Sequence, residues 1–147
     1  MPLATRLTGD LKEAIKARDQ FRVSCVRMLK ASLRNEEVKK ARELNEEETQ
    51  AVVFSLIRKG EEAIGEFRKG NREDLAKKEE REVEILYGYL PAQLTATEIE
   101  KILREVIVEL SASNVKDLGK VMKVAMARMA GKAQGKEIND IARRLLD

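Results

Sequence analysis

The chain has 147 residues, which is enough for one folded domain or two small helical ones. Charged residues make up 37% of it and aromatic residues 3%, with no Trp, which is typical of an all-α protein. There is no histidine, so the commonest general base and the commonest metal ligand are both missing. The net charge of +3 is too small to indicate nucleic-acid binding by itself.

No apolar run approaches the roughly 20 residues that a membrane-spanning helix needs. The N-terminus also lacks the apolar core of a signal peptide. We therefore expect a cytoplasmic protein without a membrane partner.

Apolar spacing predicts two helices near the N-terminus, separated by a break near Asp19. The second is expected to continue through Leu33 and Val38. Cys25 is the only cysteine and falls within the apolar pattern of this second helix, so it cannot form an internal disulfide and is expected to be a small core residue. The first helix is marked by Leu3, Leu7, Leu11, Ala14 and Ile15.

A third helix is expected to begin after Asn45, because Glu48 stands three residues later and the two can cap the helix reciprocally. Gly70 should end this helix, and Asn71 is expected to cap a fourth one over residues 72–87. The fourth helix has few apolar positions, which predicts a largely solvated surface. The glutamates at 46–48 and 61–62 have no histidine beside them, so we expect no metal site.

Residues 88–94 are the best candidate for a hinge, because they combine a glycine, a proline and a change of pattern before a new capping pair, Thr95 and Glu98. We expect an N-terminal helical domain over residues 1–90 and a small three-helix C-terminal domain over residues 95–147. No segment alternates with the period of a strand. The predicted fold class is all-α.

A helix over residues 115–130 should pack one face and expose a basic one. Gly131 is placed to end this helix in a left-handed conformation, and Gly135 leads into a final helix. Lys116, Lys120 and Lys123, here called the lysine stripe, cluster opposite the apolar face. That face consists of Leu118, Val121, Met122, Ala125, Met126 and Met129.

The basic residues of this region are the predicted RNA-binding site. Lys+Arg exceed Asp+Glu by 10 to 5 in residues 1–40 and by 10 to 8 in residues 95–147, whereas residues 41–94 hold 9 and 13. Aromatic side chains that could stack on single-stranded bases are missing from the C-terminal region, so contact with the backbone of a folded RNA fits better. The predicted RNA-binding residues are Lys116, Lys120, Lys123, Arg128, Lys132 and Lys136.

The glycines of GKAQGKE, residues 131–137, do not have the spacing of a phosphate-binding loop, and no strand precedes them. Backbone N–H groups at the start of the last helix, beside Lys132 and Lys136, could still bind a phosphate of an RNA backbone. Arg143 and Arg144 could extend the basic surface or face another side. We predict no catalytic, cofactor-binding or metal-binding residue.

Four segments resemble the GatB/YqeY family, and within it the stand-alone YqeY proteins. They are RMLKASLRNEEVKKARELNEEE at 27–48, YLPAQL at 89–94, GKVM at 119–122 and GKAQGKEIND at 131–140. GatB is a subunit of the glutamine-dependent amidotransferase that converts misacylated Glu-tRNA(Gln) or Asp-tRNA(Asn), and its C-terminal tail touches the body of the tRNA. The resemblance implies a helical region followed by a GatB-tail-like domain without the catalytic cradle. In the family, the residue before the second glycine of the last segment is usually acidic, and here it is Gln134.

Three functions remain open at this point. The resemblance favours a non-catalytic tRNA-binding module that works beside an amidotransferase or another tRNA enzyme. Family membership also implies a glutamine-dependent carbon–nitrogen ligase, although other subunits would have to supply its catalytic sites. The acidic helices over residues 41–94 would instead suit a protein–protein adaptor.

Overall fold

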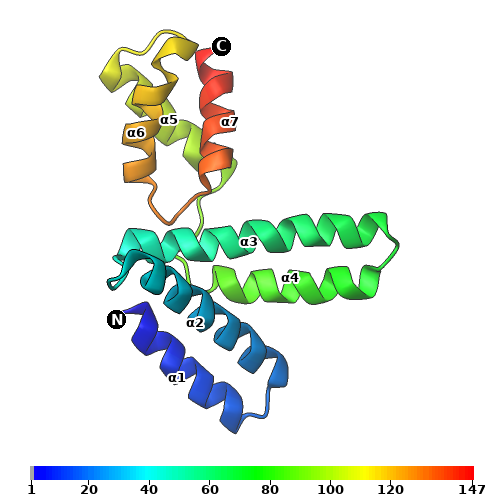
Figure 1. The fold of residues 1–147 in the computed structure, drawn as a ribbon. Helices are drawn as coiled ribbons and strands as arrows, with labels where there is room; N and C mark the ends of the chain where they lie inside the picture. The colour runs from blue at the N-terminus through cyan, green and yellow to red at the C-terminus, as the bar shows by residue number, and fades with distance from the viewer. Residues whose placement is uncertain (1) are drawn as a thin grey trace. The chain divides into compact units, whose positions relative to one another are not determined.

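The computed structural model describes residues 2–147, and within this range every regular element is helical. The helices form two compact units, one ending at Leu90 and the other beginning at Pro91. The all-α prediction is confirmed. In chain order, the elements are α1 (Leu3–Lys16), α2 (Gln20–Lys40), α3 (Glu46–Lys69), α4 (Glu73–Tyr87), α5 (Ala96–Leu110), the short 3₁₀ turn Val115–Asp117, α6 (Leu118–Arg128) and α7 (Gly135–Leu146), as Figure 1 shows.

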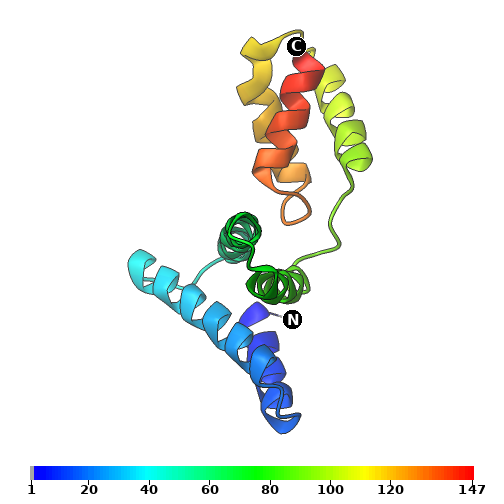
Figure 2. The ribbon, with the colours of Figure 1, turned by 90° about the vertical axis from the view of Figure 1, so that its right-hand side faces the viewer.

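The first unit consists of two antiparallel helix pairs, α1 with α2 and α3 with α4 (Figures 1 and 2). Local capping explains where two of these helices begin. The Asp19 side chain accepts a hydrogen bond from Arg22 N at 3.1 Å, which caps α2. At α3, Asn45 Oδ1 accepts from Glu48 N at 2.8 Å while Glu48 Oε1 accepts from Asn45 N at 3.1 Å, so the predicted reciprocal cap is confirmed.

The prediction for the start of α4 was wrong. Asn71 does not cap this helix: it adopts a left-handed conformation with φ of 57°, and α4 begins two residues later, at Glu73. Most of the helix is exposed or only partly buried, as predicted, and Ala76, Val83 and Leu86 are buried where α4 packs along α3. The contact with α3 buries this one side of the helix.

The core of the first unit joins all four of its helices. Cys25 is buried, as predicted, and its burial, more than any nearby charge, raises the pKa of its thiol to about 11. It is therefore a protonated core side chain at neutral pH rather than a reactive thiolate. The buried cluster comprises Leu7, Val26, Leu29, Leu33, Val53, Ile57, Val83, Leu86 and Leu90.

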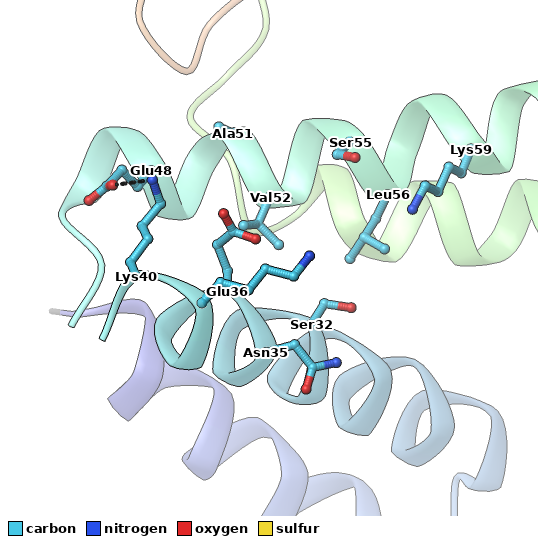
Figure 3. A pocket seen from close by; sticks show the side chains of 11 residues that line it. Ser32, Asn35, Glu36, Lys40, Glu48, Ala51, Val52, Ser55, Leu56 and Lys59 are labelled. Atoms are coloured by element: carbon cyan, nitrogen blue, oxygen red, sulfur yellow. Dashed lines mark ion pairs between the residues drawn. The ribbon is translucent and has the colours of Figure 1, made fainter. Parts of the chain in front are cut away.

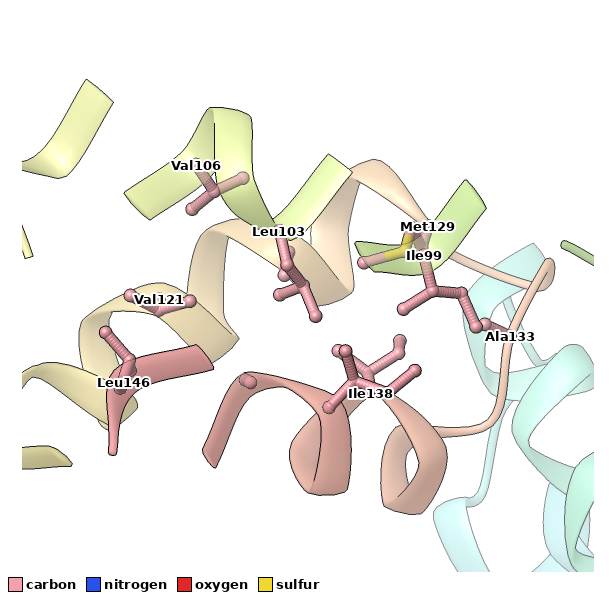
Figure 4. Close-up of a cluster of buried hydrophobic side chains, with 11 residues drawn as sticks. Ile99, Leu103, Val106, Val121, Met129, Ala133, Ile138 and Leu146 are labelled. Atoms are coloured by element: carbon pink, nitrogen blue, oxygen red, sulfur yellow. The ribbon is translucent and has the colours of Figure 1, made fainter. Parts of the chain in front are cut away.

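The second unit is a three-helix unit formed by α5, α6 and α7 around one apolar core (Figure 4). A reciprocal cap opens α5, with Thr95 Oγ1 accepting from Glu98 N at 3.2 Å and Glu98 Oε1 accepting from Thr95 N at 3.1 Å. This cap was also predicted. The fully buried side chains of this core include Ile99, Leu103, Val106, Val121, Met129 and Ile138.

The segment between the units is held at both of its ends. Tyr89 donates its hydroxyl hydrogen to Asp10 Oδ2 at 2.6 Å, and Arg6 lies over the Tyr89 ring while donating to the carbonyl of Gly88 at 2.7 Å. In the second unit, Gln93 Nε2 donates to Gly131 O at 2.8 Å. The YLPAQL segment thus begins with residues anchored on α1 and ends with residues anchored on the α6–α7 loop.

Candidate nucleic-acid interface

The side of α6 that faces solvent is determined by which residues of the helix are buried. Val121, Ala125 and Met129 are buried at a spacing of four residues, which fixes the rotation of the helix against α5 and α7. At 100° per residue, Lys120 and Lys123 then lie about 140° and 160° from the centre of this buried face. Both side chains are exposed, so the core behind α6 directs them to solvent.

The buried face of α6 is narrower than the predicted apolar stripe. Met126 was expected to pack inward but is 43% exposed. Its position lies about 60° beyond Met129 on the helix, at the edge of the face that α5 and α7 cover. It lies beside Gly135, whose missing Cβ would stand 3.3 Å from Met126 Cε.

Lys116 belongs to a 3₁₀ turn and not to α6, which begins at Leu118 instead of the predicted residue 115. Two local hydrogen bonds shape this turn: Asn114 Oδ1 accepts from Lys116 N, and Asp117 Oδ2 accepts from Ser113 N, both at 2.9 Å. The bond from Ser113, more than the nearby charge of Lys120, lowers the pKa of Asp117. Lys116 is exposed, but it lies on the turn that precedes α6 and not on the helix itself.

Arg128 differs from the lysines because it is already paired. Its guanidinium forms an ion pair with Glu109 on α5, with Nη1 at 3.1 Å from Oε1. The hydrogen bonds from Arg128 hold the pKa of Glu109 below its ordinary value, so the carboxylate stays charged and neutralises the arginine. Arg128 lies only about 60° from the centre of the buried face of α6, which brings it toward α5 and away from the exposed lysines.

Lys132 and Lys136 flank the loop between α6 and α7, and both are exposed. Gly131 adopts the predicted left-handed conformation, with φ of 75°. The carbonyl of Lys132 accepts from Leu94 N at 2.8 Å, which fixes the backbone of the loop while leaving the lysine side chain in solvent. Helix α7 begins at Gly135 without a capping hydrogen bond from the side chain of Gln134.

Arg144 is paired with a carboxylate, whereas Arg143 binds only a neutral amide and keeps its charge. Arg143 Nε donates to Asn139 Oδ1 at 3.0 Å. Arg144 and Arg104 both pair with Glu100, at 3.4 Å and 2.7 Å. Of the six predicted RNA-binding residues, Arg128 is therefore in an ion pair, and the lysine stripe with Lys132 and Lys136 is not.

The described residues offer little for other kinds of site. Between residues 2 and 147 no group of three acidic or cysteine side chains is placed to hold a metal ion. No helix in the same range is long and apolar enough to cross a membrane.

A cleft of about 420 Å³ lies between α2 and α3 (Figure 3). An ion pair between Lys40 and Glu48, 3.0 Å long, stands at one end of it. Its walls are mixed, since Val52 and Leu56 alternate with polar groups of both charges. This composition suits a polar segment of another chain better than an apolar small molecule. The polar lining residues are Ser32, Asn35, Glu36, Lys39, Lys40, Glu48, Ser55 and Lys59.

A second group of basic side chains, not singled out from the sequence, lies on α2. Arg27, Lys30 and Arg34, here called the α2 basic strip, have a spacing of three and four residues. A helical projection of α2 would have found them, because this spacing places all three on one side of a helix.

Comparison with known proteins identifies the family. The model of the family described as Yqey-like protein matches residues 4–146. A protein of Lachancea thermotolerans named Altered inheritance of mitochondria protein 41, mitochondrial, is 34% identical over 111 residues, which cover 74% of this chain and 59% of that protein. Proteins of the same name in Kluyveromyces lactis and Pyrenophora tritici-repentis are 33% and 29% identical over 73% and 90% of this chain.

The chain spans 59% and 60% of the length of the Lachancea thermotolerans and Kluyveromyces lactis proteins, and 74% of the Pyrenophora tritici-repentis protein. The family match covers nearly the whole chain and includes both helical units. The chain therefore belongs to the YqeY-like protein family.

Proposed function

We propose that this chain is a helical RNA-binding module that contacts the backbone of a folded RNA such as tRNA and performs no catalysis by itself. The lysine stripe would form the centre of the contact, with Lys132 and Lys136 at its side. Arg128 would contribute less, because Glu109 already neutralises it.

The observation that carries this proposal is the exposure of Lys120 and Lys123 on the side of α6 opposite its buried face. Neither lysine forms an ion pair within residues 2–147, and the core behind α6 holds their backbone in place. A row of unpaired ammonium groups can neutralise successive phosphates and release their counterions. Such contacts position an RNA without reading its sequence.

The resemblance to the GatB tail favours a folded tRNA as the partner, since that tail touches the body of the tRNA. An amidotransferase or another tRNA enzyme is the corresponding protein partner. We further propose that any carbon–nitrogen ligase chemistry of such an assembly comes from its other subunits.

A protein–protein adaptor is the second candidate. The cleft between α2 and α3 supports it, because its mixed lining and open shape suit a segment of a partner protein. The adaptor function would become the leading one if the chain bound no RNA while a defined protein partner filled this cleft.

Fluorescence anisotropy with labelled tRNA over a salt series tests the main proposal. Replacing the three residues of the lysine stripe by Gln should weaken binding, because each lost phosphate contact flattens the slope of log affinity against log salt by roughly 0.7 to 0.9. Stability should change by less than about 0.5 kcal/mol, as is usual for exposed positions.

A matched control removes the same charge from another side of the unit. Replacing Lys101, Arg104 and Arg144 by Gln should leave the salt slope close to that of the unaltered chain, because two of these residues already pair with Glu100. Equal slopes for the stripe variant and the unaltered chain would contradict the proposed site. A lack of tRNA binding by the unaltered chain at low salt would contradict the proposed function.

A further inference from the structure

The α2 basic strip lies on the outer side of the first unit. On α2, Arg27, Lys30 and Arg34 fall within an arc of about 60°, and Arg27 and Arg34 are about 10 Å apart along the helix axis. Arg27 and Arg34 are exposed, while Lys30 is half-buried and places Nζ 3.5 Å from Thr8 Oγ1 of α1. The strip therefore borders α1.

The orientation of the strip is fixed by the core. Val26, Leu29 and Leu33 each directly precede a strip residue and are buried, so α2 cannot rotate without exposing them. Lys12 follows Thr8 by one turn of α1 and is exposed, which adds a further positive charge on the α1 side.

The charge of the strip is not neutralised. Within residues 2–147, neither Arg27 nor Arg34 pairs with a carboxylate, in contrast to arginines such as Arg42, which pairs with Glu48 at 2.7 Å. The acidic residues of α2 are engaged elsewhere. Glu36 lines the cleft facing α3, as Figure 3 shows, and Glu37 accepts from Leu44 N at 3.3 Å.

We infer that the α2 basic strip is a second phosphate-binding face, through which the first unit also contacts the RNA. This inference rests on the proposed function and extends it from the C-terminal unit to the N-terminal one. Arginine suits the role because its planar fork matches two phosphate oxygens at once. Two weakly binding faces on one chain also give a higher overall affinity than either face alone, because the second face binds within a complex that the first has already formed.

An RNA fits this face better than a lipid surface. A helix that binds a membrane presents an apolar face to the lipid. The apolar face of α2 is instead buried in the core through Val26, Leu29 and Leu33. The exposed large apolar side chains of α2 are Val38, which is 72% exposed, and Met28, which is 36% exposed. These two side chains, ten residues apart, provide little area for insertion.

The test replaces Arg27, Lys30 and Arg34 together by Gln and measures tRNA binding by anisotropy at several salt concentrations. The slope of log affinity against log salt should flatten by roughly 2 to 3, and affinity at 0.1 M salt should fall roughly fivefold or more per lost contact. Circular dichroism melting should show an unchanged fold. A variant with Arg27→Lys and Arg34→Lys keeps the charges and should retain the original salt slope.

The control removes three positive charges from another part of the same unit, by replacing Lys69, Lys77 and Lys78 with Gln. Lys69 pairs with Glu66 at 3.6 Å, and Lys77 and Lys78 lie near Glu73 and Glu82, so this variant should retain the original slope. An equal loss in strip variant and control would show a general charge effect and overturn the inference.

Three further outcomes separate the inference from the proposed function. If the lysine stripe variant loses affinity and the strip variant binds like the unaltered chain, the inference fails and the proposed function stands. If the unaltered chain binds no tRNA, both fail. Binding to vesicles of phosphatidylcholine and phosphatidylserine that the strip variant loses, with tRNA binding unchanged, would assign the strip to a membrane and overturn the inference.

Discussion

Replacing Gly60 by Ala should destabilise the first unit, because α4 leaves no room for a side chain at this position. Gly60 lies in α3 and is buried against α4. A Cβ added there would stand 2.6 Å from Val83 Cγ2. Val83 is itself buried and β-branched, and such a side chain in a helix has essentially one favoured rotamer, so it cannot turn aside.

Two opposing effects set the size of the change. Alanine favours the helix over glycine by about 1 kcal/mol. Overpacking in a well-filled core costs about 1 to 3 kcal/mol, and the short distance to a stiff side chain places this case in the upper part of that range. The net result should be a loss of about 1 to 2 kcal/mol in the free energy of unfolding.

Gly65 provides the matched control in the same helix. A Cβ there would meet no atom within 4 Å, so Gly65→Ala should gain the helix propensity alone and stabilise the chain by about 1 kcal/mol. Urea unfolding followed by circular dichroism would compare the two variants, and Val83→Ala added to Gly60→Ala should recover part of the loss. A Gly60→Ala variant as stable as Gly65→Ala would refute the packing of α3 on α4.

Three other predictions concern the core, a titrating group and the segment between the units. Met129→Gln should destabilise the C-terminal unit by more than about 2 kcal/mol, because Met129 is 1% exposed, whereas Met126→Gln should stay within about 0.5 kcal/mol; equal thermal shifts would contradict the observed rotation of α6. Because the pKa of Cys25 is raised to about 11, the thiol stabilises the fold fully below pH 9, and this stabilisation is lost as the pH rises toward about 11. The melting temperature of Cys25→Ser should therefore fall less between pH 8.5 and 10.5 than that of the unaltered chain. An identical fall would contradict the burial of the thiol. Gln93→Ala should speed hydrogen exchange at the amide of Leu94, which binds the α6–α7 loop, and unchanged exchange would show that this anchor is not needed.

The parts of the fold that the sequence predicted well depend on residues close together in the chain. Asn45 with Glu48 and Thr95 with Glu98 satisfy the first backbone N–H groups of their helices within one turn, so the pattern is complete in four residues. Gly131 is another local case, because a left-handed residue is commonly glycine.

The parts that were missed depend on contacts between distant residues. The close packing of Val83 on α3 requires Gly60, more than twenty residues away, and nothing near Val83 indicates it. Arg128 was placed with the exposed basic residues because its partner, Glu109, lies 19 residues earlier on another helix. Helical periodicity gives the side of a helix on which a residue lies, but not what the neighbouring helix places opposite it.

The most direct test of the proposed RNA contact is a titration of the ¹⁵N-labelled chain with tRNA, followed by NMR at low salt. We predict that the amide signals of Lys120 and Lys123 shift or broaden, that the buried positions around Ala125 change less, and that the changes fade as salt is raised. Spectra in which α6 remains unchanged at about 50 mM salt, at tRNA concentrations where nonspecific contacts already form, would contradict the claim that this face binds RNA.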